Sequence, residues 1–342
     1  MGGTGSGGQT GAGGAAGSGR DGGRSDAPLA SGGSVDGGVT GNGGRVEDGG
    51  SQATGGAGGS TQVGTGGTPG IDGGKIDTGG GKIDGAAVAA GSCSRDLLKT
   101  TVDAYFKALA AHDPSTLPLA DNVKFTENAK SSKIGEAGLW KTAGALKYIH
   151  TAYDERTEGC DTVCCTAVSQ AVVPESSTDL TVALRLKMVD QKITEVETIV
   201  DRKGDYMMGP DGKALADSAS VVKWEDPPPA GKANTRAEIT KWIDKYFRMF
   251  PKGFCNMASN CKRMEDGSGN FACTEGGSCS AGDPSGKAAM EPRALMADEA
   301  TGLGVGWTMF QGGYTDMHMI KMYGDQIYAV SAILVTASDS GW

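Results

Sequence analysis

Residues 122–128 read NVKFTEN, and residues 260–266 read NCKRMED. Both stretches have Asn first, Lys third and Glu sixth, and each ends in a small amide or acid. The likeness continues outward from these stretches in both directions along the chain. The sequence therefore repeats one structural plan twice, and this repeat predicts the fold.

An amphipathic helix is predicted before each stretch. In residues 93–114, Leu98, Val102, Tyr105 and Leu109 recur at the spacing of one helical face. A proline follows shortly after the last apolar residue, which is typical of a helix end. The same pattern recurs in residues 236–251, where the matching residues are Ile239, Ile243, Tyr246 and Phe250.

Each half is predicted to close with an antiparallel hairpin. Apolar residues alternate with others over residues 180–188, which indicates a strand with one buried face. Residues 186–200 match residues 320–335, and turns are expected at Val189–Lys192 and Gly324–Asp325. Helices packed on one face of a bent antiparallel sheet make an α+β lobe.

The predicted organisation has four parts. Residues 1–92 contain 36 of the 58 glycines and no aromatic residue, so we expect a disordered glycine-rich tether. The first lobe spans residues 93–205 and the second spans 236–342. Residues 206–235 form the linker, which includes the proline-rich stretch WEDPPPAGKANT.

All eight cysteines follow the glycine-rich segment, four in each half. An even number favours disulfides in an oxidising compartment. A zinc site in the second half is the alternative, although its spacings lack the usual C-x2-C knuckle. Neighbouring Cys164 and Cys165 are poorly placed to bond to each other, so Cys93 is expected to bridge to this pair. The eight are Cys93, Cys160, Cys164, Cys165, Cys255, Cys261, Cys273 and Cys279.

Export follows from the expected disulfides, so we expect a secreted or cell-envelope-tethered protein, although no signal peptide is visible after Met1. The net charge of −9 without a basic stripe argues against nucleic acid as a partner. The sequence contains no run of 18 apolar residues, so no transmembrane segment is predicted. A small molecule is the expected partner, with no cofactor and no metal, and an internal pseudo-dimer or a homodimer is expected as the assembly.

The order of helix, ADNVKFTEN (Ala120–Asn128) and hairpins resembles the SnoaL-like, or nuclear transport factor 2-like, cone fold. GEAGLW (Gly135–Trp140) falls where the third helix of that fold begins. Both lobes together, ending in SGW (Ser340–Trp342), resemble an uncharacterised secreted bacterial and fungal two-domain family. The resemblance implies two tandem cone-fold lobes from Cys93 onward.

Steroid isomerases of the cone fold have a tyrosine on the first helix and a carboxylate base in the first strand. The resemblance places Tyr105 and Glu127 at these positions. Strand alternation puts Phe125 on the same face as Glu127, looking into an apolar interior. Such a site raises the pKa of a carboxyl and suits a general base. The alternative is a core tyrosine and a rim glutamate paired with a lysine.

In the second lobe, Tyr246 and Glu265 take the matching positions, and Arg263 replaces Phe125. A neighbouring guanidinium lowers the pKa of a carboxyl, which makes a poorer base, so catalysis is expected in the first lobe. Arg263 is predicted to be either the structural partner of Glu265 or a clamp for an anion.

Two histidines complete the candidate set. His150, with Tyr153 and Asp154 close behind, could form a His–Asp pair for acid–base chemistry, or it could lie in a polar surface loop. His318 alternates with two methionines, so it is predicted to line the cavity of the second lobe or to pack in its core. The predicted catalytic residues are Glu127, Tyr105, His150 and Asp154. The predicted ligand-binding residues are Phe125, Trp140, Tyr153, Tyr246, Arg263, Glu265 and His318.

Two functions remain open at this level. The first is an exported, cofactor-independent lyase or isomerase that abstracts a proton next to a carbonyl of a small, partly apolar molecule. The second is a non-catalytic module that binds a small ligand or a protein and forms an internal pseudo-dimer. The fold alone cannot choose between them. An enclosed pocket favours catalysis, and a filled interior favours binding or scaffolding.

Overall fold

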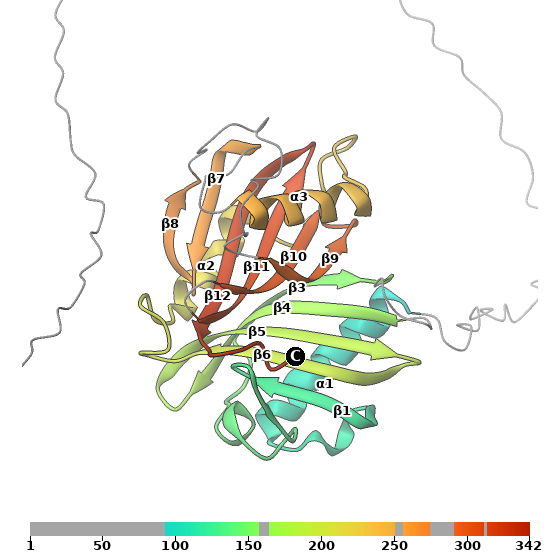
Figure 1. Cartoon of the computed structure of the whole chain (residues 1–342), viewed down its shortest axis with the longest axis vertical. Helices are drawn as coiled ribbons and strands as arrows, with labels where there is room; N and C mark the ends of the chain where they lie inside the picture. The colour runs from blue at the N-terminus through green and yellow to red at the C-terminus, as the bar shows by residue number, and fades with distance from the viewer. Residues whose placement is uncertain (1–92, 157–163, 250–255, 274–290, 311–312) are drawn as a thin grey trace, which may run out of the picture. The chain divides into compact units, whose positions relative to one another are not determined.

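The computed structural model describes residues 93–156, 164–249, 256–273, 291–310 and 313–342. All of them fall within one compact unit of the chain, Gly81–Trp342. They form two six-stranded mixed sheets, each accompanied by a long helix (Figure 1). The prediction of an α+β fold with two sheet-containing lobes is confirmed at this level.

The first lobe opens with α1 (Arg95–Ala111), which lies against one face of its sheet (Figure 1). The strand order is β2-β1-β6-β5-β4-β3. Strand β1 runs parallel to β6, and the other neighbours are antiparallel. Two short 3-10 helices, η1 (Pro114–Thr116) and η2 (Gly138–Lys141), flank β1 and β2 in sequence. The strands are β1 (Leu119–Glu127), β2 (Lys130–Ser132), β3 (Tyr148–Asp154), β4 (Cys164–Glu175), β5 (Thr178–Val189) and β6 (Lys192–Asp201).

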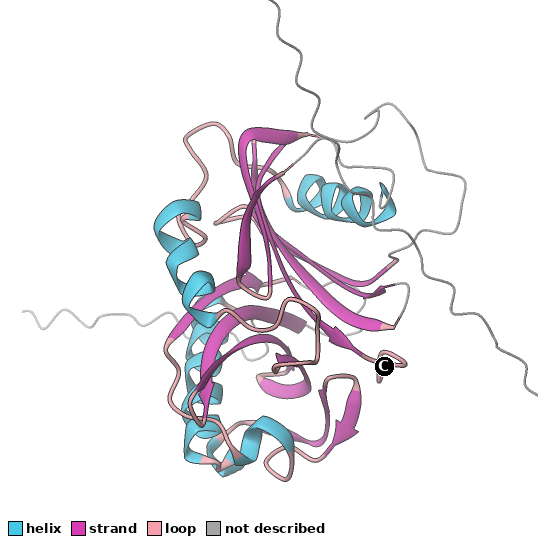
Figure 2. Cartoon of the chain, turned by 90° about the vertical axis from the view of Figure 1, so that its left-hand side faces the viewer, coloured by secondary structure: helices cyan, strands magenta, loops and turns pink. Residues whose placement is uncertain are grey.

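The second lobe repeats this topology after α3 (Arg236–Met249). Its strand order is β8-β7-β12-β11-β10-β9, with β7 parallel to β12. Figure 2 shows that the strands of this sheet are strongly curved beside the helix. Its strands are β7 (Met257–Glu265), β8 (Ser268–Ala272), β9 (Pro292–Asp298), β10 (Leu303–Phe310), β11 (Tyr314–Tyr323) and β12 (Gln326–Thr336).

Local signals explain where α1 begins and ends. The Ser94 hydroxyl accepts a hydrogen bond from the Leu97 N–H at 3.2 Å, which satisfies one free donor of the first turn. His112 ends the helix in the left-handed conformation, with φ of 57°. The predicted apolar face is the buried one, and its members are Leu98, Val102, Tyr105 and Leu109.

Both predicted hairpin turns are confirmed. Asp190 and Gln191 have φ of 48° and 63°, and they join β5 to β6. Gly324 and Asp325 have φ of 54° and 60°, and they join β11 to β12. Two successive residues with positive φ match the twist of antiparallel strands.

Two glycines let α3 pack close to its sheet. A Cβ atom on Gly306 would lie 1.9 Å from the Phe247 ring, and one on Gly304 would lie 2.5 Å from the Ile243 side chain. Real Cβ atoms do not tolerate such contacts, so β10 presents bare backbone to the helix.

The strand β5 differs from its prediction, because both of its faces are buried rather than one. Leu184 packs under α1, whereas Ala183 on the opposite face joins a core shared with the second sheet. The Gln170 amide donates to the Ser331 carbonyl across this shared core at 2.9 Å. The second face is therefore covered by the other lobe. The members of the shared core include Val168, Ala183, Ile199, Val305, Trp307, Met317, Met319 and Ile333.

Reciprocal ion pairs join the lobes. Arg95, the first residue of α1, donates two hydrogen bonds to Asp298 at the end of β9. Arg236, the first residue of α3, donates to Asp154 at the end of β3. Each lobe thus gives the arginine that begins its helix to the aspartate that ends the other lobe's edge strand. The two halves are related as the subunits of a two-fold dimer would be.

The cysteine pairing agrees with the disulfide prediction where it is described. Cys93 is bonded to Cys165 and Cys261 to Cys273, with Cα–Cα separations of 5.9 and 5.3 Å. Cys164 is disulfide-bonded as well. The zinc alternative is wrong for the second half, because two of its four thiols are bridged to each other. Cys160, Cys255 and Cys279 lie outside the described residues.

Two local differences concern helices. The stretch Gly135–Trp140, matched to a third helix, contains only the start of η2. The predicted linker contains a helix, α2 (Gly212–Val222), which the Asp211 side chain caps through the Ala214 N–H at 2.9 Å. Among the residues described, no helix has the length and apolar character needed to cross a membrane. The predicted tether, residues 1–92, lies outside the described residues.

Candidate functional site

Glu127, the last residue of β1, is held by protein groups on both carboxylate oxygens. Arg202 donates to Oε1 from both terminal nitrogens at 3.2 Å, and the Leu139 N–H donates to Oε2 at 2.8 Å. Gly138 permits this approach, because a Cβ atom there would lie 2.4 Å from the carboxylate. Burial raises the pKa of the Glu127 carboxyl, and the Leu139 N–H and Arg202 oppose that rise.

Tyr105 and Trp140 lie beside Glu127, as the sequence predicts, but their surroundings are filled. The Tyr105 and Trp140 rings meet edge to face at 5.4 Å. Burial raises the pKa of the Tyr105 hydroxyl, and the Glu127 charge raises it further. Phe125 belongs to the same core. Neither Tyr105 nor Glu127 lines any of four cavities that described residues form elsewhere in the chain.

His150 and Asp154 point to the opposite face of the first sheet from Glu127. His150 stacks on the Trp224 ring at 4.7 Å, and its Nδ1 lies 3.0 Å from the Tyr148 hydroxyl. Burial lowers the pKa of His150 to about 3, so the ring is neutral at physiological pH. The two residues therefore do not join the Tyr105–Glu127 pair.

Asp154 is engaged between the lobes rather than with His150. Besides Arg236, it accepts hydrogen bonds from the Arg156 and Ala297 N–H groups at 3.1 and 3.4 Å. Tyr153 lies on the α1 side of β3, where the Arg95 guanidinium sits 4.7 Å from its ring centre. Tyr153 therefore contacts α1 through Arg95, and Asp154 contacts the second lobe through Arg236 and Ala297.

The second lobe has a cavity where the first is filled. A cavity of about 250 Å³ opens on the face of its sheet that α3 covers. It brings together three predicted residues, Arg263, Glu265 and His318. Its volume lies slightly below the range of pockets for drug-sized ligands, about 300–1,000 Å³, so it suits a small molecule. The other lining residues are Tyr206, Phe310, Asp316, Ala332 and Leu334.

His318 and Asp316 form the central pair of this cavity. They lie two positions apart on β11, so both project from the same face of the strand. His318 Nδ1 lies 3.1 Å from Asp316 Oδ1, although the two atoms do not meet hydrogen-bond geometry, and neither has a hydrogen-bond partner in the described parts of the chain. Both side chains are almost fully buried, at 4% and 2% exposure. This geometry fixes the imidazole with Nδ1 toward the carboxylate.

Aromatic residues of α3 cover the imidazole. The ring centres of Tyr246 and Phe247 lie 5.4 and 5.1 Å from that of His318. Burial raises the pKa of the Tyr246 hydroxyl, and the positive charge of Arg263 acts against that rise. The predicted placement of Tyr246 near the second-lobe site therefore agrees with the structure.

Arg263 and Glu265 form an ion pair on β7, at the wall of the cavity. The Tyr206 hydroxyl donates to Glu265 Oε2 at 3.0 Å. Burial raises the pKa of Tyr206, and the Glu265 carboxylate raises it further. The cavity thus contains one cation, two carboxylates, one imidazole and an apolar wall. Among the described residues, no group of three side chains is arranged to hold a metal ion.

Sequence reasoning missed five residues of this cavity, which are Tyr206, Phe310, Asp316, Ala332 and Leu334. Asp316 was within reach, because the alternation that places His318 inward also places Asp316 inward. Tyr206 falls in the predicted linker, and Phe310 ends a strand without a matching motif, so neither carried a signal.

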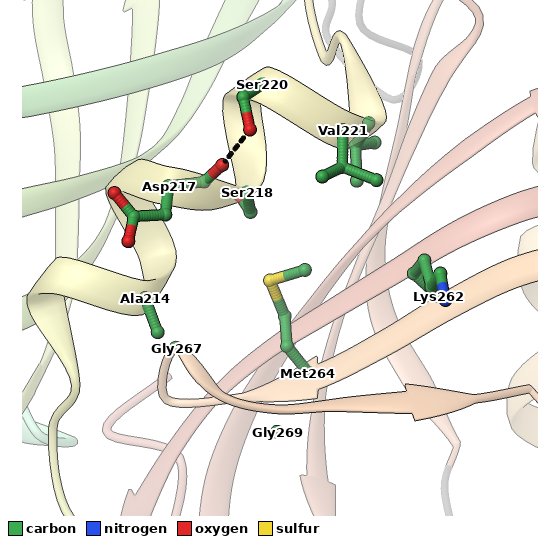
Figure 3. Close-up of a pocket in the computed structure, with 10 residues that line it drawn as sticks. Ala214, Asp217, Ser218, Ser220, Val221, Lys262, Met264, Gly267 and Gly269 are labelled. Carbon is green, nitrogen blue, oxygen red and sulfur yellow. Dashed lines mark hydrogen bonds between the residues drawn. The ribbon is translucent and has the colours of Figure 1, made fainter.

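A second cavity, of about 280 Å³, lies between α2 and the β7–β8 hairpin (Figure 3). Met264 projects from β7 toward the helix, and Val221 is 60% exposed beside it. Lys262 and Asp217 provide charged groups at this site. None of the predicted site residues lines it.

A third cavity contains the aromatic ring of Trp342. This ring lies beneath Lys124 Nζ at 3.9 Å and the Arg185 guanidinium at 4.5 Å. The indole N–H donates to the Thr126 hydroxyl at 3.0 Å. The nearby Arg185 and Arg293 both bond to Glu197, so their charges are already paired.

Comparisons with known proteins add little about activity. Residues 232–334 match the model of a family described as "Domain of unknown function (DUF8021)", which lies within the second half of the chain. No curated protein matches the chain. Among the solved structures that match is one from Rhodopseudomonas palustris, described as a "Putative Isomerase". It is 10% identical, with 31% of this chain and 89% of that chain covered and a TM-score of 0.23. A TM-score this low supports no conclusion about shared fold or activity.

Proposed function

We propose that this chain is an exported protein of two tandem SnoaL-like lobes, whose second lobe binds a small, partly apolar carbonyl compound and abstracts a proton next to its carbonyl. The observation that supports this most is the buried His318–Asp316 pair in a cavity that also holds Arg263. The reaction class is a cofactor-independent isomerisation or elimination. The disulfides support export, because such bonds persist in oxidising compartments.

In this proposal, His318 is the general base. In this role the imidazole carries its proton on Nδ1, the nitrogen 3.1 Å from Asp316 Oδ1, which leaves Nε2 as the unprotonated nitrogen that accepts the substrate proton. Asp316 also stabilises the imidazolium that forms, as the carboxylate of a Ser-His-Asp triad does. The Arg263 guanidinium supplies positive charge for the enolate oxygen. In an isomerisation the proton returns from Nε2 to another carbon. In an elimination the leaving group departs with the electron pair of its bond to carbon and takes the proton from Nε2, which restores the neutral imidazole.

The proposal moves catalysis from the first lobe to the second. Glu127 is the carboxylate that the resemblance to steroid isomerases indicated, but two donors hold it and a filled core surrounds it. A base must reach the proton that it removes, so an enclosed ion-paired carboxylate is poorly placed. We propose that Glu127 instead fixes Arg202 and the turn before η2.

Exchange of substrate protons with solvent tests the reaction class directly. A panel of small cyclic and aromatic ketones is first screened by thermal shift against the full chain. Binders are then incubated with the protein in D₂O, and deuterium at the carbon next to the carbonyl is followed by NMR. We expect wild type to catalyse exchange, His318→Gln to lose it by a factor of about 10²–10⁴, and Asp316→Asn to reduce it.

The alternative function is a non-catalytic module, with the first lobe serving as a scaffold that pairs with the second. The filled core around Tyr105 favours this alternative for the first lobe. Ketones that bind the cavity without any exchange in wild type would support it for the whole chain. In that case Arg263→Gln should weaken binding, whereas His318→Gln should leave it unchanged.

A further inference from the structure

Asn128, the last residue of NVKFTEN, ties β1 to β6 with its side-chain amide. Its Nδ2 donates to the Val200 carbonyl at 3.0 Å, and its Oδ1 accepts from the Val200 N–H at 2.7 Å. Its backbone N–H donates to Thr198 at 2.9 Å, and its φ is 48°. A side-chain amide carries both donating N–H groups and an accepting oxygen, so Asn128 satisfies both backbone groups of Val200.

Asp266 occupies the same place in the second lobe. Its φ is 49°, and its backbone N–H donates to Ala332 at 2.8 Å. Its Oδ1 accepts from the Leu334 N–H at 3.2 Å, as Asn128 accepts from Val200. Asp266 Oδ2 takes the position of the donating Nδ2, and it has no hydrogen-bond partner among the described residues. In the repeat, the Leu334 carbonyl corresponds to the Val200 carbonyl that accepts from Asn128 Nδ2, and a carbonyl offers only an acceptor.

The charges facing Asp266 are all acidic. They come from Asp201 on β6, Asp316 on β11 and its neighbour Glu265 on β7. The nearest cation on β7, Arg263, is already paired with Glu265. Asp266 is fully buried, and burial together with the Asp201 charge raises its pKa well above the usual range. An ionised carboxylate here would face both repulsion and loss of water.

Asp201 adds a second buried acid from the other lobe. The residue is fully buried, and neither carboxyl oxygen has a hydrogen-bond partner within the described residues. Burial and the nearby Asp205 raise the pKa of Asp201 to about 7. Asp201 ends the last strand of the first lobe, and Asp266 begins the β7–β8 turn of the second. The charge of Asp201 therefore acts on Asp266 across the boundary between the lobes.

We propose that Asp266 is un-ionised in the folded protein and donates its Oδ2–H to the Leu334 carbonyl, and that Asp266 and Asp201 together form an acid-stabilised lock between the lobes. The protonated carboxyl reproduces both contacts that the Asn128 amide makes. Leu334 and Glu265 line the second-lobe cavity, so ionisation of Asp266 acts on the wall of that cavity. The inference does not depend on the proposed function.

The direction of the pH effect follows from linkage. An unfolded aspartic acid ionises near pH 4, whereas the folded forms of Asp201 and Asp266 hold their protons to higher pH. The folded state therefore binds more protons above about pH 4. The contribution of the protonated Asp201 and Asp266 carboxyls to the free energy of unfolding is fully present below about pH 4. It is lost as pH rises toward about 7 and beyond.

Two reciprocal substitutions in the full chain test the lock. Asp266→Asn installs the first-lobe residue in the second lobe, and Asn128→Asp does the reverse. We expect Asp266→Asn to raise Tm by about 4–8 °C at pH 8 and to leave it nearly unchanged at pH 4. We expect Asn128→Asp to lower Tm at pH 8 and to change it little at pH 4. Asp201→Asn should reduce the fall in Tm between pH 5 and pH 8.

Other outcomes would overturn the proposal. Equal destabilisation by Asp266→Asn at both pH values would mean that Asp266 works as a carboxylate. A rise of wild-type Tm on adding Ca²⁺ at pH 8, lost in Asp266→Asn and reversed by EDTA, would mean that a cation balances the acids. If a variant fails to fold, ¹³C NMR titration of the aspartate carboxyls in wild type decides. An Asp266 carboxyl that titrates near pH 4 rejects the lock.

Discussion

The Asp298 carboxylate at the end of β9 accepts two hydrogen bonds from the Arg95 guanidinium at the start of α1, at 2.8 and 2.9 Å. The same carboxylate accepts from the Tyr153 N–H at 3.0 Å. In the mirrored arrangement, Asp154 bonds to Arg236 and accepts from the Ala297 N–H. One boundary between the lobes is therefore built twice from equivalent residues.

The two aspartates should contribute equally to stability. The carboxylates of Asp298 and Asp154 are almost fully buried, with 1% and 2% exposure. Removing either charge takes one buried carboxylate partner from an arginine that is 30% (Arg95) or 16% (Arg236) exposed. We expect Asp298→Asn and Asp154→Asn each to lower the free energy of unfolding by about 2–4 kcal/mol, measured by urea denaturation. The exposed Lys133–Glu136 pair is the control, and Glu136→Gln should cause no measurable loss. A large loss of unfolding free energy in only one of these two variants would contradict equivalent roles for Asp298 and Asp154.

His150 should make the protein sensitive to acid. Its pKa is lowered to about 3 by burial, so the folded state binds fewer protons than the unfolded chain between about pH 3 and 6.5. Its contribution to stability is present above pH 6.5 and is lost as pH falls toward 3. We expect an unfolding free energy about 2 kcal/mol lower at pH 5 than at pH 7 from this group. In His150→Gln we expect the free energy of unfolding to fall less between pH 7 and pH 5. An equal fall in the variant and in wild type would mean that His150 does not cause the acid sensitivity.

Lys321 should control how firmly the segment before α3 is held. Its buried ammonium donates to the carbonyls of Trp224, Asp226 and Thr301 at 3.0, 2.6 and 2.6 Å. Lys321→Met removes all three donors, and we expect a loss of about 2–3 kcal/mol and faster proteolysis within residues 224–235. Burial lowers the pKa of Lys321 to about 8, so wild-type stability should rise between pH 8 and 10.5 and the variant's should not. If Lys321→Met were as resistant to protease as wild type, the three hydrogen bonds of Lys321 would not be what holds residues 224–235.

The Glu127→Gln variant tests whether catalysis takes place in the first lobe or in the second. Arg202 would lose one of its two carboxylate partners and keep Glu175, bound at 2.8 and 3.0 Å. We expect a loss of about 1–2 kcal/mol in unfolding free energy, with ketone binding and solvent exchange retained. Glu175→Gln is the matched control and should behave alike. Loss of turnover in Glu127→Gln alone, with the fold intact, would return catalysis to the first lobe.

Local patterns determined the elements of each lobe. The 3.6-residue period of Leu98, Val102, Tyr105 and Leu109 marks the buried face of α1, and the turns at residues 189–192 and 324–325 lie where predicted. These features depend on near neighbours in the chain, so the sequence alone reveals them. The alternation on β11 likewise placed His318 inward.

Contacts between segments that are far apart in the chain determined the surroundings of the predicted site residues. The sequence predicted chemistry at Glu127, but Arg202, 75 residues away, occupies that carboxylate, and Tyr105 packs in the buried core of the first lobe. Asp154 looked like a partner for His150, yet it bonds to Arg236, 82 residues away. The sequence could show which residues share a strand face. Only the tertiary structure shows what covers that face, because the covering group comes from a distant part of the chain and its approach is set by packing rather than by spacing.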